Sequence, residues 1–213
     1  MIKSRLKFKL NKLYFLKNKT ILIFGPAVTI DKEIIDVSKY DFIIITNNMV
    51  NIFFNMFPSI KLKKNVILFS NSLFFRTNKE TLMQWDNYVY CYFLPYKYIT
   101  TYKKETNNPI FENKYFKING KDSLGLSKIL EILKQVSFKH IYITGCTFYS
   151  EASDIKNNYM ENYMIKQGLN CNLLSRPGEH DLKGNIDYFN DFYNNNKNKI
   201  EICQELKKYI VNI

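Results

Sequence analysis

Short apolar runs that stop at glycine, proline or asparagine recur along the 213-residue chain. Such runs, bounded by turn-forming residues, are typical of buried strands. We expect strands within 19–27 (KTILIFGPA), 41–48 (DFIIITNN), 65–72 (NVILFSNS), 88–94 (YVYCYFL), 139–149 (KHIYITGCTFY) and 199–203 (KIEIC).

Helical spacing is clearest between the fourth and fifth of these runs. Over 122–136, apolar residues recur at intervals of three and four: Leu126, Ile129, Leu130 and Leu133. We expect Ser123 to cap this helix and Asp122 to complement its positive end. Because strands alternate with helices, the pattern predicts an α/β fold with a mostly parallel sheet and helices on both faces.

Length and composition favour a single domain. A hydrophobic content of 46% is ample for a buried core, and we find no internal repeat. Residues 1–19 form a basic arm and residues 20–213 the domain. Within the domain, the polar stretch at about 150–178 is expected to be a mobile lid. No apolar run approaches the roughly 18 residues of a membrane span and no signal peptide is visible, so we expect a cytoplasmic protein.

The cysteines indicate reduced thiols. Cys91, Cys146, Cys171 and Cys203 lie far apart, with no CxxC pair and no cluster with histidine. A structural zinc site or a disulfide framework requires closer grouping.

The net charge of +12 raises the possibility of an anionic partner. Lysines outnumber arginines 28 to 3, whereas base readers and phosphate clamps usually rely on the bidentate arginine fork. We therefore favour an anionic membrane surface over nucleic acid. Residues 1–19 carry seven positive charges interleaved with Leu, Phe and Tyr. This composition suits peripheral contact with the inner face of a membrane, although a solvated arm explains it equally well.

Polar residues and glycines follow several predicted strands in the same way. In open α/β sheets, ligands bind beyond the carboxyl ends of the strands. Asparagine side chains and exposed amides there suit the hydroxyls and base edges of a nucleotide; the simpler alternative is that these residues only form turns. The candidate nucleotide-binding residues at these ends are Gly25, Pro26, Asn47, Asn48, Asn71, Ser72, Gly145 and Thr147.

The order of these motifs resembles the bacterial sialyltransferases of glycosyltransferase family 42. The resemblance runs from about residue 20 to 210. It rests on FGPA, TNN and SNSLFF after the first three strands, the helix start in KDSLGLSKI, then IYITGCTFY, and a lone histidine in GEHDLKGN. It implies a single Rossmann-like domain of the glycosyltransferase-A type. Such an enzyme transfers a sugar from a CMP-activated donor, with inversion and without a metal or other cofactor.

The resemblance also implies roles for individual residues. His180 matches the general base, and Tyr149 matches a tyrosine that donates a hydrogen bond to the departing phosphate. Tyr159 and Tyr163 both lie where a second such tyrosine is expected, and neither has the expected spacing.

Gly25, Asn48 and Asn71 match nucleotide- and sugar-contacting positions. The turn formed by Ser123, Leu124 and Gly125 matches the helix start near the phosphate and the donor carboxylate. Lys121 stands closest to the family's arginine and lacks its bidentate fork.

The chemistry is consistent with the residues taken alone. Histidine suits proton removal at neutral pH, and His180 lies in a loop, flanked by Glu179 and Asp181, either of which could orient the ring. His140 precedes a strand, at the opposite end from the expected site. The Asp-x-Asp triplet of metal-dependent glycosyltransferases is absent. Tyrosine hydroxyls and the amides that open the 123–136 helix are therefore expected to meet the phosphate charge.

Several alternatives stay open. The donor sugar could be sialic acid or another 2-keto sugar acid such as Kdo, and the acceptor a lipooligosaccharide or capsule-like glycan. A catalytically silent nucleotide-binding or scaffold protein of the same fold, or a basic nucleic-acid-binding domain, would share many of these features. Homo-oligomerisation is also left open.

Overall fold

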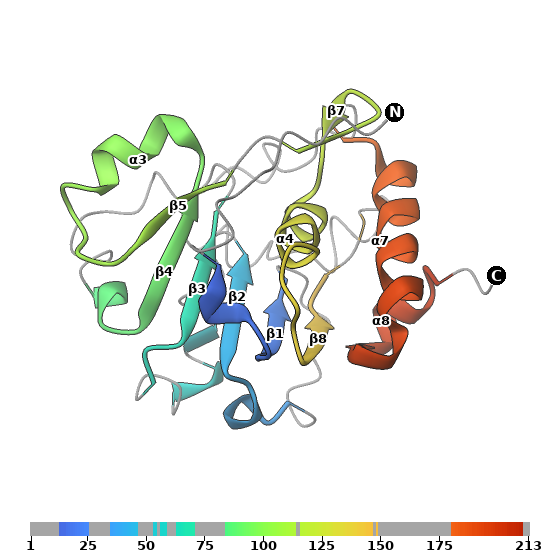
Figure 1. Cartoon of the computed structure of the whole chain (residues 1–213), viewed down its shortest axis with the longest axis horizontal. Coiled ribbons are helices and arrows are strands. Elements are labelled where there is room, and N and C mark those ends of the chain that lie inside the picture. The colour runs from blue at the N-terminus through green and yellow to red at the C-terminus, as the bar shows by residue number, and fades with distance from the viewer. Residues whose placement is uncertain are drawn as a thin grey trace.

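The computed structural model describes residues 13–25, 35–46, 53–54, 56–58, 63–70, 84–113, 116–146, 148 and 180–210. Seven parallel strands form one sheet in the order β5-β4-β3-β2-β1-β8-β9 (Figure 1). The strands are β1 Thr20–Phe24, β2 Phe42–Thr46, β3 Val66–Phe69, β4 Val89–Leu94, β5 Ile110–Glu112, β8 His140–Thr144 and β9 Ile200–Ile202. All six predicted strands are confirmed. The short edge strand β5 was not predicted.

The strand order shows a doubly wound, Rossmann-like fold. From β1 the chain steps through β2, β3 and β4 to β5 on one side. It then returns through α4 (Gly125–Leu133) to β8, and through α7 (Leu182–Asn196) to β9 on the other side. Because such crossovers are right-handed, this reversal places the helices of the two halves on opposite faces. Phe53 and Phe57, from the β2–β3 crossover, pack against Phe24 with ring centroids 4.9 and 6.3 Å apart.

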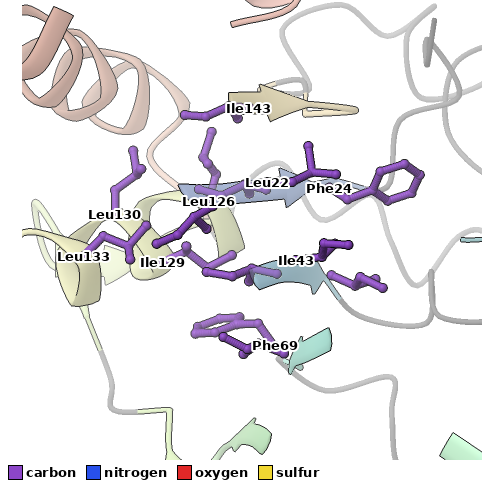
Figure 2. Packing of buried hydrophobic residues seen from close by; sticks show 14 of the residues in the cluster. Leu22, Phe24, Ile43, Phe69, Leu126, Ile129, Leu130, Leu133 and Ile143 are labelled. Atoms are coloured by element: carbon purple, nitrogen blue, oxygen red, sulfur yellow. The ribbon is translucent and has the colours of Figure 1, made fainter. Parts of the chain in front are cut away.

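The apolar face of α4 packs on the centre of the sheet. Figure 2 shows the apolar side chains of this helix gathered beside β1 and β2. The four residues with helical spacing are all buried: Leu126, Ile129, Leu130 and Leu133. Burying a side chain of this kind contributes about 1.5–3 kcal/mol, so the helix is held mainly by this contact.

Residues 13–16 belong to the folded domain, although the sequence prediction assigned them to the basic arm. They form a 3₁₀ turn, η2 (Tyr14–Leu16), in which Leu13 and Leu16 are each 1% exposed. The Phe15 ring lies 5.3 Å from that of Phe42 and 5.1 Å from that of Tyr90. Leu13, Leu16 and Phe15 therefore pack in the core, and Leu13 and Leu16 are inaccessible to a lipid surface.

The remaining elements are short. They are η3 Val37–Lys39, α3 Tyr96–Tyr102, β6 Lys117–Ile118, β7 Lys121–Asp122, η9 Lys197–Lys199 and α8 Gln204–Lys207. Cys91, Cys146 and Cys203 are buried and free, as expected of reduced core thiols. Cys171 lies outside the described residues. Within the described ranges, no helix combines the length and apolar character needed to cross a membrane.

Candidate active site at the carboxyl edge of the sheet

A small hairpin holds His180 in place. Strands β6 and β7 pair antiparallel across Asn119 and Gly120, whose φ angles are +50° and +83°. An Asn-Gly pair is favoured in such a turn because both positions need the left-handed region. His180 then forms a parallel bridge with Asp122 of β7. Because α4 and α7 lead back to the amino ends of β8 and β9, both helices begin at the carboxyl edge, where Figure 1 also shows β7. His180 lies at the same edge, because it pairs with β7 and stands two residues before α7.

One hydrogen bond sets the tautomer of His180. The ring atom Nδ1 lies 2.8 Å from the backbone carbonyl oxygen of Asp122. A carbonyl oxygen only accepts, so Nδ1 must carry the hydrogen. In the neutral ring the lone pair is therefore on Nε2, which is the arrangement a general base requires.

Asp181 does not orient the imidazole, contrary to one of the two sequence-based possibilities. Its carboxylate caps α7 by accepting from the Gly184 amide at 3.0 Å, and it accepts from the Asn119 side chain at 2.7 Å. These two hydrogen bonds, the first the stronger influence, hold the pKa of Asp181 below its usual range. The other candidate, Glu179, lies outside the described residues.

Asn185 ties the start of α4 to the start of α7. This fully buried side chain accepts through Oδ1 from the Leu124 amide at 2.9 Å and from the Ser127 hydroxyl at 2.7 Å. Its Nδ2 donates to the Asp181 carbonyl oxygen at 2.6 Å. The bonds made by Asn185, Asp181 and His180 thus join the hairpin and both helix starts into one unit. Asn185 is the last residue of the GEHDLKGN motif, but no role for it was predicted from the sequence.

Ser123 does not cap α4, which begins at Gly125, one residue later than a cap at Ser123 would place it. Leu124 is the N-cap residue and no side chain caps the helix through it. The buried Ser123 hydroxyl instead donates to the Phe116 carbonyl oxygen at 2.7 Å. Among the three residues of the predicted Ser123-Leu124-Gly125 turn, only Gly125 remains partly exposed.

Two lysines near the hairpin and the helix starts, Lys121 and Lys128, differ in their surroundings. Lys121 is exposed on β7 and lies close enough to Asp181 to help lower the pKa of that carboxyl group. Burial lowers the pKa of Lys128, an effect that the nearby Asp122 carboxylate opposes. Asp122 Oδ1 is buried without a hydrogen-bond donor in the described part of the chain. The carboxylate therefore has the Lys128 charge as its electrostatic counterpart.

Gly25 and Gly145 meet where the strand order reverses. The Gly25 amide donates to the Thr144 carbonyl oxygen at 2.8 Å. A Cβ at Gly25 would lie 2.2 Å from the Gly145 oxygen and 2.3 Å from the Cys146 sulfur. Gly145 has a φ of +64°, and a Cβ there would lie 2.7 Å from the Gly25 oxygen. Two backbones touch at this point, between β1 and β8, where ligands bind in open α/β sheets.

Buried polar side chains line the carboxyl edge beside this point. Each stands at or directly after the end of a strand: Thr46, Ser70, Asn113 and Thr144. The Asn113 amide donates to the Ser70 carbonyl oxygen at 3.1 Å. The Ser70 hydroxyl, fully buried, has no hydrogen-bond partner among the residues that the structure describes. Thr46 and Ser70 are in the same TNN and SNS motifs that indicated Asn47 and Asn71, so the signal for them was present.

Many predicted site residues lie outside the described residues. These are Pro26, Asn47, Asn48, Asn71, Ser72, Thr147, Tyr149, Tyr159 and Tyr163, together with the lid at about 150–178. His140 is the first residue of β8, at the amino edge, as predicted. Across the described ranges, no three His, Cys, Asp or Glu side chains gather in a way that could hold a metal ion.

Comparisons of the chain with models of known protein families, with curated proteins and with solved structures found no match.

Proposed function

We propose that this protein is a glycosyltransferase that moves sialic acid, or a related 2-keto sugar acid, from a CMP-activated donor to a hydroxyl of a glycan acceptor. The observation that carries the proposal is the hydrogen bond from His180 Nδ1 to the Asp122 carbonyl oxygen, which leaves Nε2 as a base. The motif order that resembles family 42 supplies the donor class, and the doubly wound sheet supports a nucleotide site at its carboxyl edge.

In the proposed reaction, the acceptor oxygen attacks the anomeric carbon of the donor. The bond from that carbon to the phosphate oxygen breaks, and CMP leaves with the electron pair. His180 Nε2 takes the proton of the acceptor hydroxyl, and the sugar is transferred with inversion. Tyr149 and one of Tyr159 and Tyr163 remain the proposed donors to the departing phosphate, and the reaction is proposed to need no metal.

We propose that the buried polar side chains at the strand ends help to bind the nucleotide and take no part in the proton transfer. Thr46, Ser70, Asn113 and Thr144 place hydroxyl and amide groups, without formal charge, along the edge where the nucleotide would lie. Such groups suit a ribose and a pyrimidine base, which carry many hydrogen-bonding atoms and no charge. We assign them to the same proposed site.

Release of CMP tests the proposal directly. The protein is incubated with CMP-sialic acid or CMP-Kdo, with and without a lipooligosaccharide acceptor, and CMP is measured by chromatography. We expect slow release without acceptor, faster release with it, and little change with excess EDTA. Loss of activity in EDTA that Mn²⁺ or Mg²⁺ restores would contradict the metal-independent mechanism. No release from either donor, together with a rise in melting temperature with CMP, would instead show a silent nucleotide-binding protein.

A further inference from the structure

Lysines lie within the three residues before each of five neighbouring strands of the parallel sheet. Because parallel strands begin at the same edge, these residues gather at the amino edge, opposite the candidate site. In sheet order from β3 to β9 they are Lys63 and Lys64, Lys39, Lys19, Lys139, and Lys197 and Lys199. At about 4.8 Å per strand spacing, the four spacings from β3 to β9 give a row about 19 Å long.

Backbone contacts hold the middle of this row together. The Lys139 amide donates to the Lys19 carbonyl oxygen at 2.9 Å, and the Asn18 amide donates to the Ser137 carbonyl oxygen at 2.7 Å. The turn that carries Lys17 therefore lies beside the start of β8. The exposed Tyr14 ring lies under the Lys17 ammonium group, 5.4 Å from its nitrogen. An exposed tyrosine next to lysines is a combination favoured at membrane interfaces.

The row carries more positive than negative charge. Lys19 pairs with Asp41 at 3.5 Å and Lys39 with Asp36 at 3.8 Å. The other five lysines of the row are exposed and have no ion pair in the described part of the chain. These five strands carry one more exposed acidic residue, Glu201 in β9. Seven lysines thus face three carboxylates.

We propose that this lysine row is a docking surface for an anionic phospholipid bilayer. The attraction of a lipid surface is diffuse, so separate ammonium charges without fixed geometry are sufficient. Nucleic-acid proteins that read base sequence usually rely on arginine forks, and single-strand binders rely on several stacked aromatic rings, whereas Tyr14 is a single exposed ring beside the row. The row contains only lysines, and all three arginines of the chain, Arg5, Arg76 and Arg176, lie outside the described residues. The lipid surface is therefore the partner that the residues fit.

This docking surface is independent of the proposed chemistry. It uses the amino edge, whereas His180 and the polar strand ends are at the carboxyl edge. A protein bound through the row would present its candidate site away from the bilayer. Vesicle binding can thus be measured whether or not the protein transfers a sugar.

The test compares two triple variants of the full chain that change net charge by the same amount. The row variant carries Lys63→Glu, Lys139→Glu and Lys199→Glu. The control variant carries Lys117→Glu, Lys183→Glu and Lys207→Glu, three exposed lysines on the hairpin, the start of α7 and α8. Circular dichroism and melting temperature establish that both variants fold. Sedimentation then measures binding to vesicles of phosphatidylcholine alone or with 30% phosphatidylglycerol.

We expect the parent protein to bind only the anionic vesicles, and less tightly as salt rises. Each lysine near such a surface contributes about fivefold in affinity, so the row variant should bind at least about 100-fold more weakly. The control variant should stay within about fivefold of the parent. Equal losses in the two variants would show that net charge alone matters and would overturn the proposal. So would absence of binding by the parent, or a row variant that loses affinity for a 20-nucleotide RNA while keeping its vesicle binding.

Discussion

The two edges of the same sheet use polar residues in opposite ways. At the carboxyl edge, hydroxyl and amide groups are buried, glycines bring two backbones into contact, and His180 is held by a carbonyl oxygen. At the amino edge, polar residues are exposed and charged, and aspartates cap strands and turns. Buried polar groups require fixed partners, whereas exposed charges do not. Under the two proposals above, the carboxyl edge binds a specific ligand and the amino edge a diffuse anionic surface.

The largest expected effect is at His180. If Nε2 removes the acceptor proton, His180→Asn should lower turnover by about 10²–10⁴-fold, the usual range for loss of a general base. The affinity for CMP should change little, because the imidazole would serve the acceptor and not the nucleotide. Turnover and CMP binding are measured separately, by chromatography and calorimetry.

The other histidine is the matched control for this change. His140 begins β8 at the amino edge, so His140→Asn should keep nearly full turnover. A His180→Asn protein that retains most of its activity would show that another group takes the proton.

The next effect is steric and concerns Gly25. Gly25→Ala places a methyl group within 2.3 Å of the Gly145 oxygen and the Cys146 sulfur. Overpacking of this severity should cost about 3 kcal/mol, or roughly 6–12 °C in melting temperature. Gly120→Ala meets no atom within 4 Å and only strains a φ of +83°, so we expect about 1–2 kcal/mol. Equal melting temperatures for the two variants would show that the contact between Gly25 after β1 and Gly145 after β8 is not tight.

Asn185 tests the connection between the helix starts. Asn185→Leu keeps the volume and leaves the Leu124 amide and the Ser127 hydroxyl buried without their shared acceptor. We expect a loss of about 2–3 kcal/mol in urea unfolding. Because Asn185 also donates to the carbonyl oxygen of Asp181, the residue after His180, the ¹⁵N signals that report the Nδ1–H tautomer of His180 should also change.

Asn195→Leu, an exposed change on the same helix, is the control and should stay within about 0.5 kcal/mol of the parent. An unchanged His180 spectrum in the Asn185 variant would mean that the hairpin alone orients the ring.

The smallest effect belongs to the amino edge. The Thr20 amide and hydroxyl donate hydrogen bonds to the Asp41 carboxylate at 2.8 and 3.0 Å. The hydrogen bond from the amide is the main cause of the lowered pKa of Asp41. A lowered folded-state pKa adds stability above the unfolded value near 3.9, and that stability is lost as pH falls through the folded value. Since the carboxylate is largely solvated, Asp41→Asn should cost less than about 1 kcal/mol at neutral pH. The difference from the parent should shrink in acid; a constant difference from pH 7 to pH 3 would exclude a charge effect.

Much of the fold could be predicted because each buried strand is a short apolar run. The missed elements have weaker signals. α3 (YKYITTY) is built from aromatic and β-branched residues, which favour strands, and β5 has only three residues. The β6–β7 hairpin is two residues long on each side, yet its Asn119-Gly120 turn was a readable signal.

The candidate site was predictable only in part. His180 could be selected because of its residue type and its loop position. Its partner is a backbone carbonyl 58 positions away, a group that every residue has, so no pattern could reveal it. The same holds for Asn185, whose bonds reach Leu124 and Ser127 across the helix interface. Thr46 and Ser70 were missed because the asparagines after them were taken as the whole signal.

Helix α7 connects the two edges of the sheet, and its length gives the distance between the candidate site and the lysine row. His180 lies two residues before its first residue, and Lys197 directly follows its last. Fifteen residues at about 1.5 Å each make the helix about 22 Å long. A protein seated on a bilayer by its lysine row would therefore work at about that elevation. Hydroxyls at the level of the lipid headgroups would be out of reach, and the outer sugars of an extended glycan would be within it. Acceptors tethered to vesicles by spacers of increasing length should be used only once they exceed this height, and equal use of the shortest tether would contradict it.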